Sequence, residues 1–245
     1  MNAPRTPLLP APSLLHRAIL RFDLRQALRQ IDEASLAEVR LRFRNSCPGA
    51  YESKYWHLDG QLLKNLHRAW RLRLRHPPFG LSILDLGTGF GLFPFVCRHY
   101  GHRAIGLDVE DQSDSLYHLV TGVLGVERLL GTIRSREPLP VAGQRFDLVT
   151  GFAVMFNDPQ GEPWGAGEWG YFLADLANRR LAPGGRVFLS FNRDRNDRYF
   201  DRETETLFRS VGGEIEGRDV YFPSLDPAVL GAERVTAVEP LAVEA

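Results

Sequence analysis

The feature that most constrains the fold is an alternation of short apolar segments with helical ones between residues 81 and 222. This alternation is typical of βαβ units, in which parallel strands are joined by helices that cover both faces of a sheet. We predict strands at residues 82–86, 103–107, 128–133, 146–150 and 185–191, with a terminal hairpin at 214–216 and 219–222. We predict helices at residues 90–100, 113–124, 168–181 and 202–211. The predicted fold class is α/β, with a doubly wound, mostly parallel sheet of seven strands.

A helical extension precedes this region. Apolar residues recur at helical spacing from Leu14 to about Arg44, and a capping box of Ser35 and Glu38 predicts the start of a second helical segment. A third helix is predicted at residues 59–75. We interpret its basic side chains as a solvated face rather than an RNA-binding one: Lys64, Arg68, Arg71, Arg73 and Arg75. The expected parts are a disordered, proline-rich leader (1–13), the helical extension (14–78), the main domain (79–223) and a C-terminal tail (224–245).

The charge balance and the cysteine content disfavour several function classes. The chain has 30 Lys and Arg residues against 30 Asp and Glu residues, so it lacks the positive excess on which nucleic-acid binding depends. Its two cysteines, Cys47 and Cys97, lack the spacing of a zinc or disulfide motif, which fits a reducing compartment. Prolines in the leader break the apolar helix of a signal peptide, and no apolar run reaches the roughly 18 residues of a membrane span. We expect a cytoplasmic protein with no nucleic-acid partner and no metal.

The most informative motif is a strand that runs directly into a glycine-rich turn and then a helix. The apolar segment 83–86 leads into Gly87, Gly89 and Gly91. Glycines there let a ligand approach the main chain at the N-terminus of the following helix. Asp108 ends the next predicted strand, 108 − 89 = 19 residues after Gly89. That is close to the offset of about 20 residues at which an acidic side chain binds ribose hydroxyls, so the two features predict a pocket for an adenosine-containing ligand.

Two cofactor classes fit such a pocket, and the glycine spacing separates them. A dinucleotide fingerprint needs a third glycine at position 92, where this chain has Leu92. The run 83–91 instead resembles the first motif of the class I, Rossmann-like S-adenosylmethionine-dependent methyltransferases. Segments 104–108, 145–149 and 181–187 are similar to that family's second strand, its fourth strand and the turn before its fifth strand. The resemblance extends over most of the main domain and implies S-adenosylmethionine as the cofactor.

The resemblance also implies which residues bind this cofactor. They belong to the glycine loop, to the ends of later strands and to the segment before the third helix: Asp85, Gly87, Thr88, Gly89, Phe90, Gly91, Asp108, Val109, Ile133, Arg134, Gly151, Phe152 and Tyr55. The loop would hold the methionine portion, Asp85 its amino group or the loop itself, and Asp108 the ribose. The family often has an Asp after the third strand that reads the adenine amino group. Ser135 stands there in this chain, which leaves the main chain of Ile133 or Arg134 for that contact.

Candidate catalytic residues lie after the fourth predicted strand and before the third predicted helix. Methyl transfer depends mainly on placing the acceptor in line and excluding water, and an acceptor hydroxyl also needs a base. The candidates are Glu168, Asn157 and His57. Glu168 is the candidate base, although a negative charge in the first turn of a helix is also explained by the helix dipole. Tyr55 and His57 are candidates for a lid over the cofactor, or for ordinary packing.

The acceptor is narrowed mainly by motifs that the chain lacks. Methyltransferases of base amino groups usually carry an Asn/Asp-Pro-Pro-aromatic run after the fourth strand, and residues 151–157 do not match it. No nucleophilic cysteine stands there either. We therefore predict an S-adenosylmethionine-dependent methyltransferase that acts on a small-molecule, sugar or lipid-linked acceptor. Two alternatives stay open: a NAD(P)-dependent oxidoreductase and a non-catalytic S-adenosylmethionine-binding module.

Overall fold

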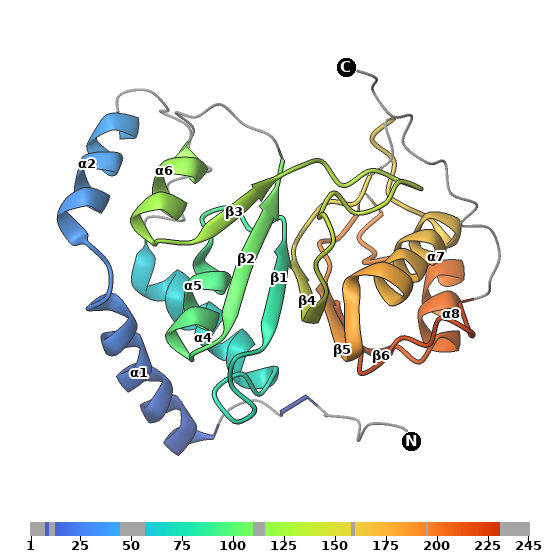
Figure 1. The fold of residues 1–245 in the computed structure, drawn as a ribbon, viewed down its shortest axis with the longest axis horizontal. Helices are drawn as coiled ribbons and strands as arrows, with labels where there is room; N and C mark the ends of the chain where they lie inside the picture. The colour runs from blue at the N-terminus through green and yellow to red at the C-terminus, as the bar shows by residue number, and fades with distance from the viewer. Residues whose placement is uncertain are drawn as a thin grey trace.

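The computed structural model describes residues 8–9, 13–44, 57–109, 116–157, 160–194 and 196–230. Within these residues seven strands form one sheet in the order β3-β2-β1-β4-β5-β7-β6 (Figure 1). The strands are β1 (Ser82–Leu86), β2 (Arg103–Asp108), β3 (Glu127–Leu130), β4 (Phe146–Phe152), β5 (Leu181–Ser190), β6 (Glu214–Glu216) and β7 (Asp219–Phe222). The first five pair in parallel, and β7 pairs antiparallel with both β5 and β6. The prediction of a doubly wound, mostly parallel sheet of seven strands is confirmed.

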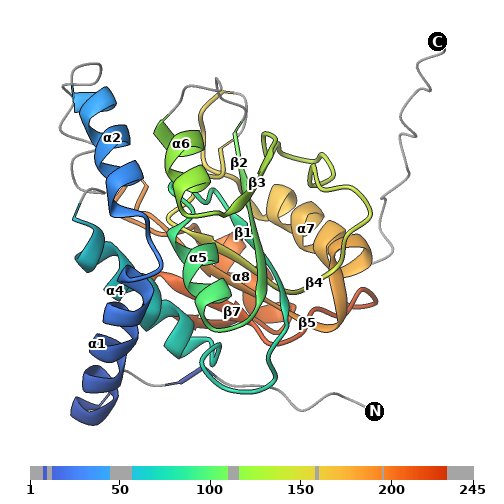
Figure 2. The ribbon, with the colours of Figure 1, turned by 60° about the vertical axis from the view of Figure 1, so that its left-hand side comes forward.

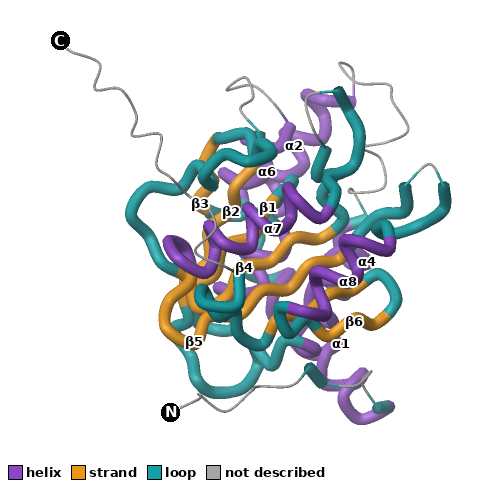
Figure 3. The backbone as a smooth tube through the Cα atoms, turned by 90° about the vertical axis from the view of Figure 1, so that its right-hand side faces the viewer, coloured by secondary structure: helices purple, strands orange, loops and turns teal. Residues whose placement is uncertain are grey.

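Helices cover both faces of the sheet. They are α1 (Leu14–Leu28), α2 (Glu33–Arg44), α4 (Leu58–Arg71), α5 (Leu92–His99), α6 (Leu116–Val123), α7 (Ala166–Asp175) and α8 (Arg202–Ser210). Helices α4, α5 and α6 share a core on one face, and α7 and α8 lie on the other (Figures 1 and 3). Helices α1 and α2 form an outer layer, because α1 packs on α4 and α2 packs on α6 (Figure 2).

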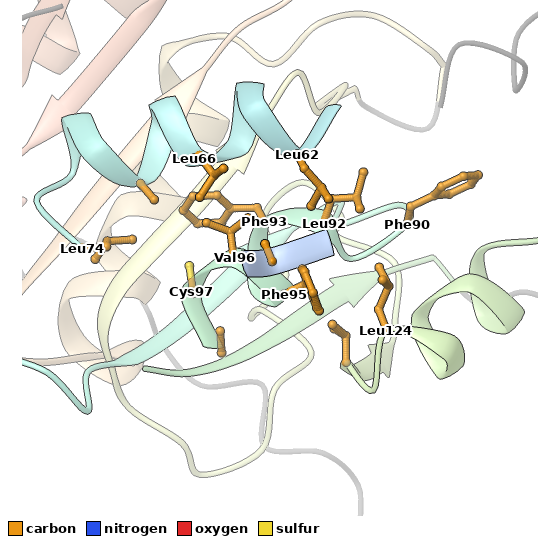
Figure 4. Close-up of a cluster of buried hydrophobic side chains, with 14 of the residues drawn as sticks. Leu62, Leu66, Leu74, Phe90, Leu92, Phe93, Phe95, Val96, Cys97 and Leu124 are labelled. Atoms are coloured by element: carbon orange, nitrogen blue, oxygen red, sulfur yellow. The ribbon is translucent and has the colours of Figure 1, made fainter. Parts of the chain in front are cut away.

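The two faces of the sheet carry two separate hydrophobic cores. Successive side chains of a strand point to opposite faces, so Ile83 joins the core under α5 while Leu84 joins the core under α7. On the first face, Leu62 and Leu66 of α4 lie over Phe93 of α5 (Figure 4). This packing holds α4 against the helix that follows the glycine loop.

Two charged clusters attach the helical extension to the rest of the molecule. Asp23 of α1 is 5% exposed, and its carboxylate accepts hydrogen bonds from Arg75 Nε at 2.7 Å and from the Tyr100 hydroxyl at 2.8 Å. Arg71, the last residue of α4, has its Nη1 atom 2.5 Å from Asp219 Oδ2 of β7. The extension is therefore joined to the end of α5 and to β7 by buried or half-buried polar contacts.

Several predicted boundaries were wrong. The helix predicted at residues 59–75 ends at Arg71, and the helix predicted at 168–181 is α7, which ends at Asp175 and is followed by a π-helical segment, Leu176–Arg180. Three further errors have a local reason. Helix α2 begins at Glu33 rather than at the capping box, because Asp32 Oδ1 accepts the amides of Ala34 and Ser35. Strand β3 was predicted at residues 128–133 and is shorter. It ends at Leu130 because its partner there is Asp108, the last residue of β2.

Strand β5 was predicted to begin at residue 185, yet it begins at Leu181. Residue Phe146 pairs with Leu181, and the next paired residues are Leu148 and Arg186, so the turn at residues 182–185 is an irregularity within the strand. The predicted proline and glycine turn is present, but it interrupts a ladder rather than preceding it.

Candidate functional site

A cavity of about 400 Å³ opens at the carboxyl ends of β1, β2 and β4, which is where open α/β sheets place their ligands. We call it the cofactor cavity. It is lined by residues of the glycine loop, of α4 and of the segments after β4 and β5: Gln61, Lys64, Asn65, Arg68, Asp85, Gly87, Thr88, Gly89, Phe90, Leu92, Phe93, Asp108, Tyr117, Phe152, Ala153, Asn192 and Arg218.

The glycine loop joins β1 to α5 and needs glycine at its ligand-facing turn. Gly87 and Gly89 have φ angles of 61° and 55°, a left-handed conformation that side chains disfavour. A Cβ at Gly89 would find only Tyr117 within 4 Å, at 3.9 Å, so a side chain there would stand in the cavity. The bare surface of Gly89 therefore forms a cradle for a ligand.

A third glycine lets the loop lie close to the neighbouring strand. Gly106 lies in β2, and a Cβ added to it would be 2.3 Å from Thr88 Cγ2. The amide of Gly87 in turn donates to the carbonyl of Leu107 at 2.8 Å. The loop is therefore held on β2 by a backbone contact that only glycine at position 106 permits.

Asp85 is a buried carboxylate directly beneath the loop. It is 3% exposed, and its two oxygens accept the hydroxyls of Thr150 at 2.7 Å and Thr88 at 2.9 Å. Burial raises the pKa of Asp85 from 3.8 to about 6, and these two hydrogen bonds oppose that rise. Asp85 is thus ionised at neutral pH, at a cost to the folded state.

Asp108 stands at the end of β2 and binds the glycine loop itself. Its Oδ2 accepts the amide of Gly89 at 2.6 Å, and its Oδ1 accepts the amide of Val109 at 2.8 Å. Each carboxylate oxygen has a second lone pair for a further donor. Asp108 therefore lines the cavity in a position to accept hydrogen bonds from a ligand while it orients Gly89.

Comparisons with known proteins agree with this architecture. No family model matches the sequence. Over 149 residues, 58% of this chain, it is 27% identical to the ubiquinone biosynthesis O-methyltransferases of Salmonella enteritidis PT4 and Klebsiella pneumoniae subsp. pneumoniae. The match spans 57% of each relative, so the chain covers little more than half of their length. The same chain has this 27% identity to the relatives, the bare glycine surface at Gly89 and the strand β7 that runs antiparallel to β5.

The chain is thus similar to named O-methyltransferases over little more than half of its length. Among solved structures it is similar to Streptomyces venezuelae DesVI, with 18% identity and a TM-score of 0.41 over 59% of this chain and 83% of that one. It is also similar to the PH0226 protein of Pyrococcus horikoshii OT3, with 17% identity and a TM-score of 0.44 over 62% of this chain and 84% of that one.

One wall of the cofactor cavity comes from α4 and was not predicted. The wall residues recur at the spacing of one helical face: Gln61, Lys64, Asn65 and Arg68. The Arg68 guanidinium lies 4.0 Å above the centre of the Phe152 ring, and its Nη1 donates to Asn65 Oδ1 at 2.8 Å. Polar residues opposite an apolar stripe are equally typical of a solvated face, so only the position of α4 reveals their role.

Several cofactor residues that the family resemblance implied do not line the cavity. They are Gly91, Val109, Ile133, Arg134 and Gly151. Gly91 precedes α5 with a φ of 71°, and Gly151 lies within β4 beneath Val154. Arg134 is exposed and pairs with Glu137 at 3.5 Å. Tyr55 lies outside the described residues.

The three candidate catalytic residues lie in different places. Asn157 lines a second cavity beyond β4 and β5. Glu168 lines neither cavity; its Oε1 pairs with Arg136 Nη2 at 2.9 Å, and its Oε2 accepts the amide of Gly165 at 3.2 Å, as a helix-capping side chain does. His57 is exposed and precedes the first residue of α4, beside a separate surface cavity.

The described residues contain neither a metal-binding cluster nor a membrane-spanning helix. Among the described residues no group of three or more His, Cys, Asp or Glu side chains is placed to bind a metal ion. None of the helices in the described ranges combines the length and the apolar character that crossing a bilayer requires.

Proposed function

We propose that the chain binds S-adenosylmethionine in the cofactor cavity and transfers its methyl group to a small-molecule acceptor. The observation that carries this proposal is the bare surface of Gly89, which faces the cavity between the carboxylates of Asp85 and Asp108. A cavity of about 400 Å³ lies within the range of roughly 300–1,000 Å³ that small-molecule sites occupy.

The charges around the cavity fit a ligand that carries an amino group, a carboxylate and ribose hydroxyls. Asp85 would hold the amino group, because its carboxylate is the buried negative charge beneath the loop. Lys64 and Arg68 on the α4 wall would stabilise the carboxylate, and Asp108 would accept the ribose hydroxyls. Tyr117 would cover the adenine side of the cavity.

When bound, the cofactor supplies an electrophilic methyl group on a positively charged sulfur. The chain's own part is to orient this group, to exclude water and to place the acceptor in line with it. The ring of Phe152, beneath Arg68, forms an apolar wall that would exclude water. Methyl transfer by this route needs no nucleophilic side chain.

The class of acceptor is supported by the comparisons and by the cavity beyond β5. The matched curated relatives are named as O-methyltransferases of ubiquinone biosynthesis. An oxygen atom of a small organic molecule is therefore the acceptor we favour over a sugar or a lipid-linked group. The second cavity shares Asn192 with the cofactor cavity, so a small molecule bound there would lie beside the cofactor.

The proposal is tested by following a labelled methyl group. The full chain is incubated with methyl-labelled S-adenosylmethionine and the small-molecule fraction of a cell extract, and labelled products are separated by chromatography. A Gly89→Val variant, whose side chain would fill the cradle, serves as the control. We expect a labelled small molecule with the wild type and none with the variant. Binding of the cofactor without any labelled product would favour a non-catalytic module instead.

A further inference from the structure

A second cavity of about 450 Å³ lies beyond β4 and β5, and aromatic side chains dominate its walls. We call it the aromatic cavity. It is lined by residues 154–157, 161–164, 169, 191–194, 196 and 198–201, which include Phe156, Trp164, Trp169, Phe191, Tyr199 and Phe200. Met155 stands among these residues with 73% of its surface exposed. Its side chain adds an apolar surface to the rim of the aromatic cavity.

The aromatic walls continue a network of tilted and edge-to-face rings. The ring of Trp169 lies 4.8 Å from that of Phe156 and 5.3 Å from that of Phe191, and Phe191 lies 5.4 Å from Phe200. Their interplanar angles are 60°, 67° and 77°. Such geometry stabilises aromatic pairs beyond the burial of area, and one more planar ring in the cavity would extend it.

The charged groups around the aromatic cavity are already engaged with one another. Arg193 Nη1 binds Asp197 Oδ1, and Arg198 Nη2 lies 3.6 Å from Asp194 Oδ2. Asp201 accepts the amide of Thr204 at the start of α8. An anionic ligand would have to displace these carboxylates from the guanidinium groups, and a cationic ligand would have to displace the guanidinium groups. The cavity therefore favours a neutral ligand.

One polar group in the wall lacks a partner. Trp164 is 5% exposed, and its buried Nε1 has no hydrogen-bond acceptor among the described residues. The backbone around it is fixed, because the Trp164 amide donates to the carbonyl of Phe156 at 2.9 Å. An unpaired buried donor costs about 1–3 kcal/mol. Because Trp164 lines the aromatic cavity, a ligand oxygen that reaches Nε1 would relieve that cost.

The aromatic cavity meets the cofactor cavity at one point. Asn192 lines both cavities, Ala153 lines the cofactor cavity, and Val154 lines the aromatic cavity. Asn192 Nδ2 donates to the carbonyl of Ala153 at 2.8 Å. Ala153 has a φ of 60°, which is strained for a residue with a side chain. A strained, hydrogen-bonded turn thus separates the two cavities at the carboxyl end of β4.

We infer that the aromatic cavity binds the methyl acceptor, and that this acceptor is a neutral aromatic ring carrying a hydroxyl group. The inference rests on the proposed function, because the acceptor must reach the methyl group through the junction at Asn192. In the transfer, a lone pair of the hydroxyl oxygen forms the new carbon–oxygen bond. The carbon–sulfur bond breaks, its electron pair stays on the sulfur, and the hydroxyl proton passes to water.

Indole N–H signals of the full chain provide the test. The sequence has four tryptophans, and Trp164 is assigned by comparison with a Trp164→Phe variant in ¹H–¹⁵N spectra. The probes are 2-naphthol (neutral), 2-naphthoate (anionic) and 1-naphthylmethylamine (cationic). We expect 2-naphthol to shift the Trp164 Nε1–H signal downfield and saturably, with at least tenfold weaker binding of both charged probes. Trp70, which packs on His16 at 4.2 Å far from this cavity's lining, should not shift.

The outcomes separate this inference from the proposed function. In a parallel titration, S-adenosylhomocysteine is expected to shift the backbone amide of Gly89. If that shift occurs while 2-naphthol leaves Trp164 unmoved, or if a charged probe binds as tightly, the acceptor inference is overturned and cofactor binding stands. If 2-naphthol shifts Trp164 but Gly89 does not respond, the ligand class of the cavity is supported and methyl transfer is overturned.

A matched pair of variants tests the role of the indole donor. Trp164→Phe keeps an aromatic wall but removes the N–H, so we expect 2-naphthol to bind about fivefold more weakly, with unchanged affinity for S-adenosylhomocysteine. Trp70→Phe is the same substitution outside the cavity and should change neither affinity. Equal weakening in both variants, or none in Trp164→Phe, would show that this donor does not contact the ligand.

Discussion

The buried carboxyl group of Asp85 links the stability of this protein to its site. Its pKa is about 6 in the folded protein and 3.8 in the unfolded chain, so the folded state binds more protons between these values. The stability that the protonated group contributes is fully present below about pH 3.8. It is lost as the pH rises through about 6. An ionised Asp85 at neutral pH is therefore costly for folding, and in the proposed complex its charge would hold the amino group of the ligand.

Asp85→Asn is expected to raise stability and weaken binding together. The variant removes the ionisable group but keeps polar atoms near Thr88 and Thr150. A shift of about two pK units corresponds to roughly 1–3 kcal/mol, so the variant should unfold at higher urea concentration than the wild type at pH 8. The two proteins should be nearly equal at pH 4. Its affinity for S-adenosylhomocysteine should fall. A wild type that is the more stable protein at pH 8 would contradict the account.

Asp108→Ala is expected to lower the affinity for S-adenosylhomocysteine by about 1–3 kcal/mol. The carboxylate both orients Gly89 and faces the cavity, and the variant removes both contacts. Calorimetric titration measures the change. Asp147→Ala is the matched control, because Asp147 accepts the amide of Ser82 at the opposite end of β1. Unchanged affinity in Asp108→Ala would show that this residue does not bind the ribose.

At the scale of elements, the sequence was informative where backbone geometry restricts the residue type. The run of glycines after the first predicted strand could be predicted because its backbone conformation favours glycine. The acid that ends the second predicted strand could be predicted from its distance in sequence to Gly89. The α4 wall of the cofactor cavity could not be predicted from the sequence. Lys64 and Arg68 were interpreted as a solvated face, and nothing in the sequence shows that α4 lies beside the glycine loop. Contacts between elements distant in sequence depend on tertiary packing, which periodicity does not encode.

Gly106→Ala is expected to displace the glycine loop from β2. The new Cβ would lie 2.3 Å from Thr88 Cγ2, so the loop must move, at a cost of about 1–3 kcal/mol in unfolding free energy. Binding of S-adenosylhomocysteine should weaken as well. Gly122→Ala is the control, because no atom lies within 4 Å of that Cβ in α6. Urea unfolding and calorimetry report both effects. If the two variants have the same unfolding free energy and the same affinity for S-adenosylhomocysteine, the position of the loop does not depend on Gly106.

At the scale of the whole molecule, the helical extension and the sheet are joined through buried polar contacts. Burial raises the pKa of Tyr100, which keeps its hydroxyl protonated as a donor to Asp23. Arg75 binds the same carboxylate. Because α1 and α4 share one core with α5, the wall of the cofactor cavity depends on the docking of the extension.

Asp23→Ala is expected to destabilise the protein by about 1–3 kcal/mol, because it leaves Arg75 and Tyr100 without their acceptor. Thermal unfolding measures the loss. Glu205→Ala removes an exposed pair with Arg209 and should change stability by less than about 0.5 kcal/mol. If the Asp23→Ala and Glu205→Ala variants unfold at the same temperature, the contacts of Asp23 do not anchor the extension.

The measurement that tests the central claim most directly is a calorimetric titration of the full chain with S-adenosylhomocysteine and, separately, with NADH. The account predicts saturable heat with one S-adenosylhomocysteine per chain and no response to NADH, because the loop has Leu92 where a dinucleotide site needs glycine. Saturable binding of NADH with no response to S-adenosylhomocysteine would contradict it.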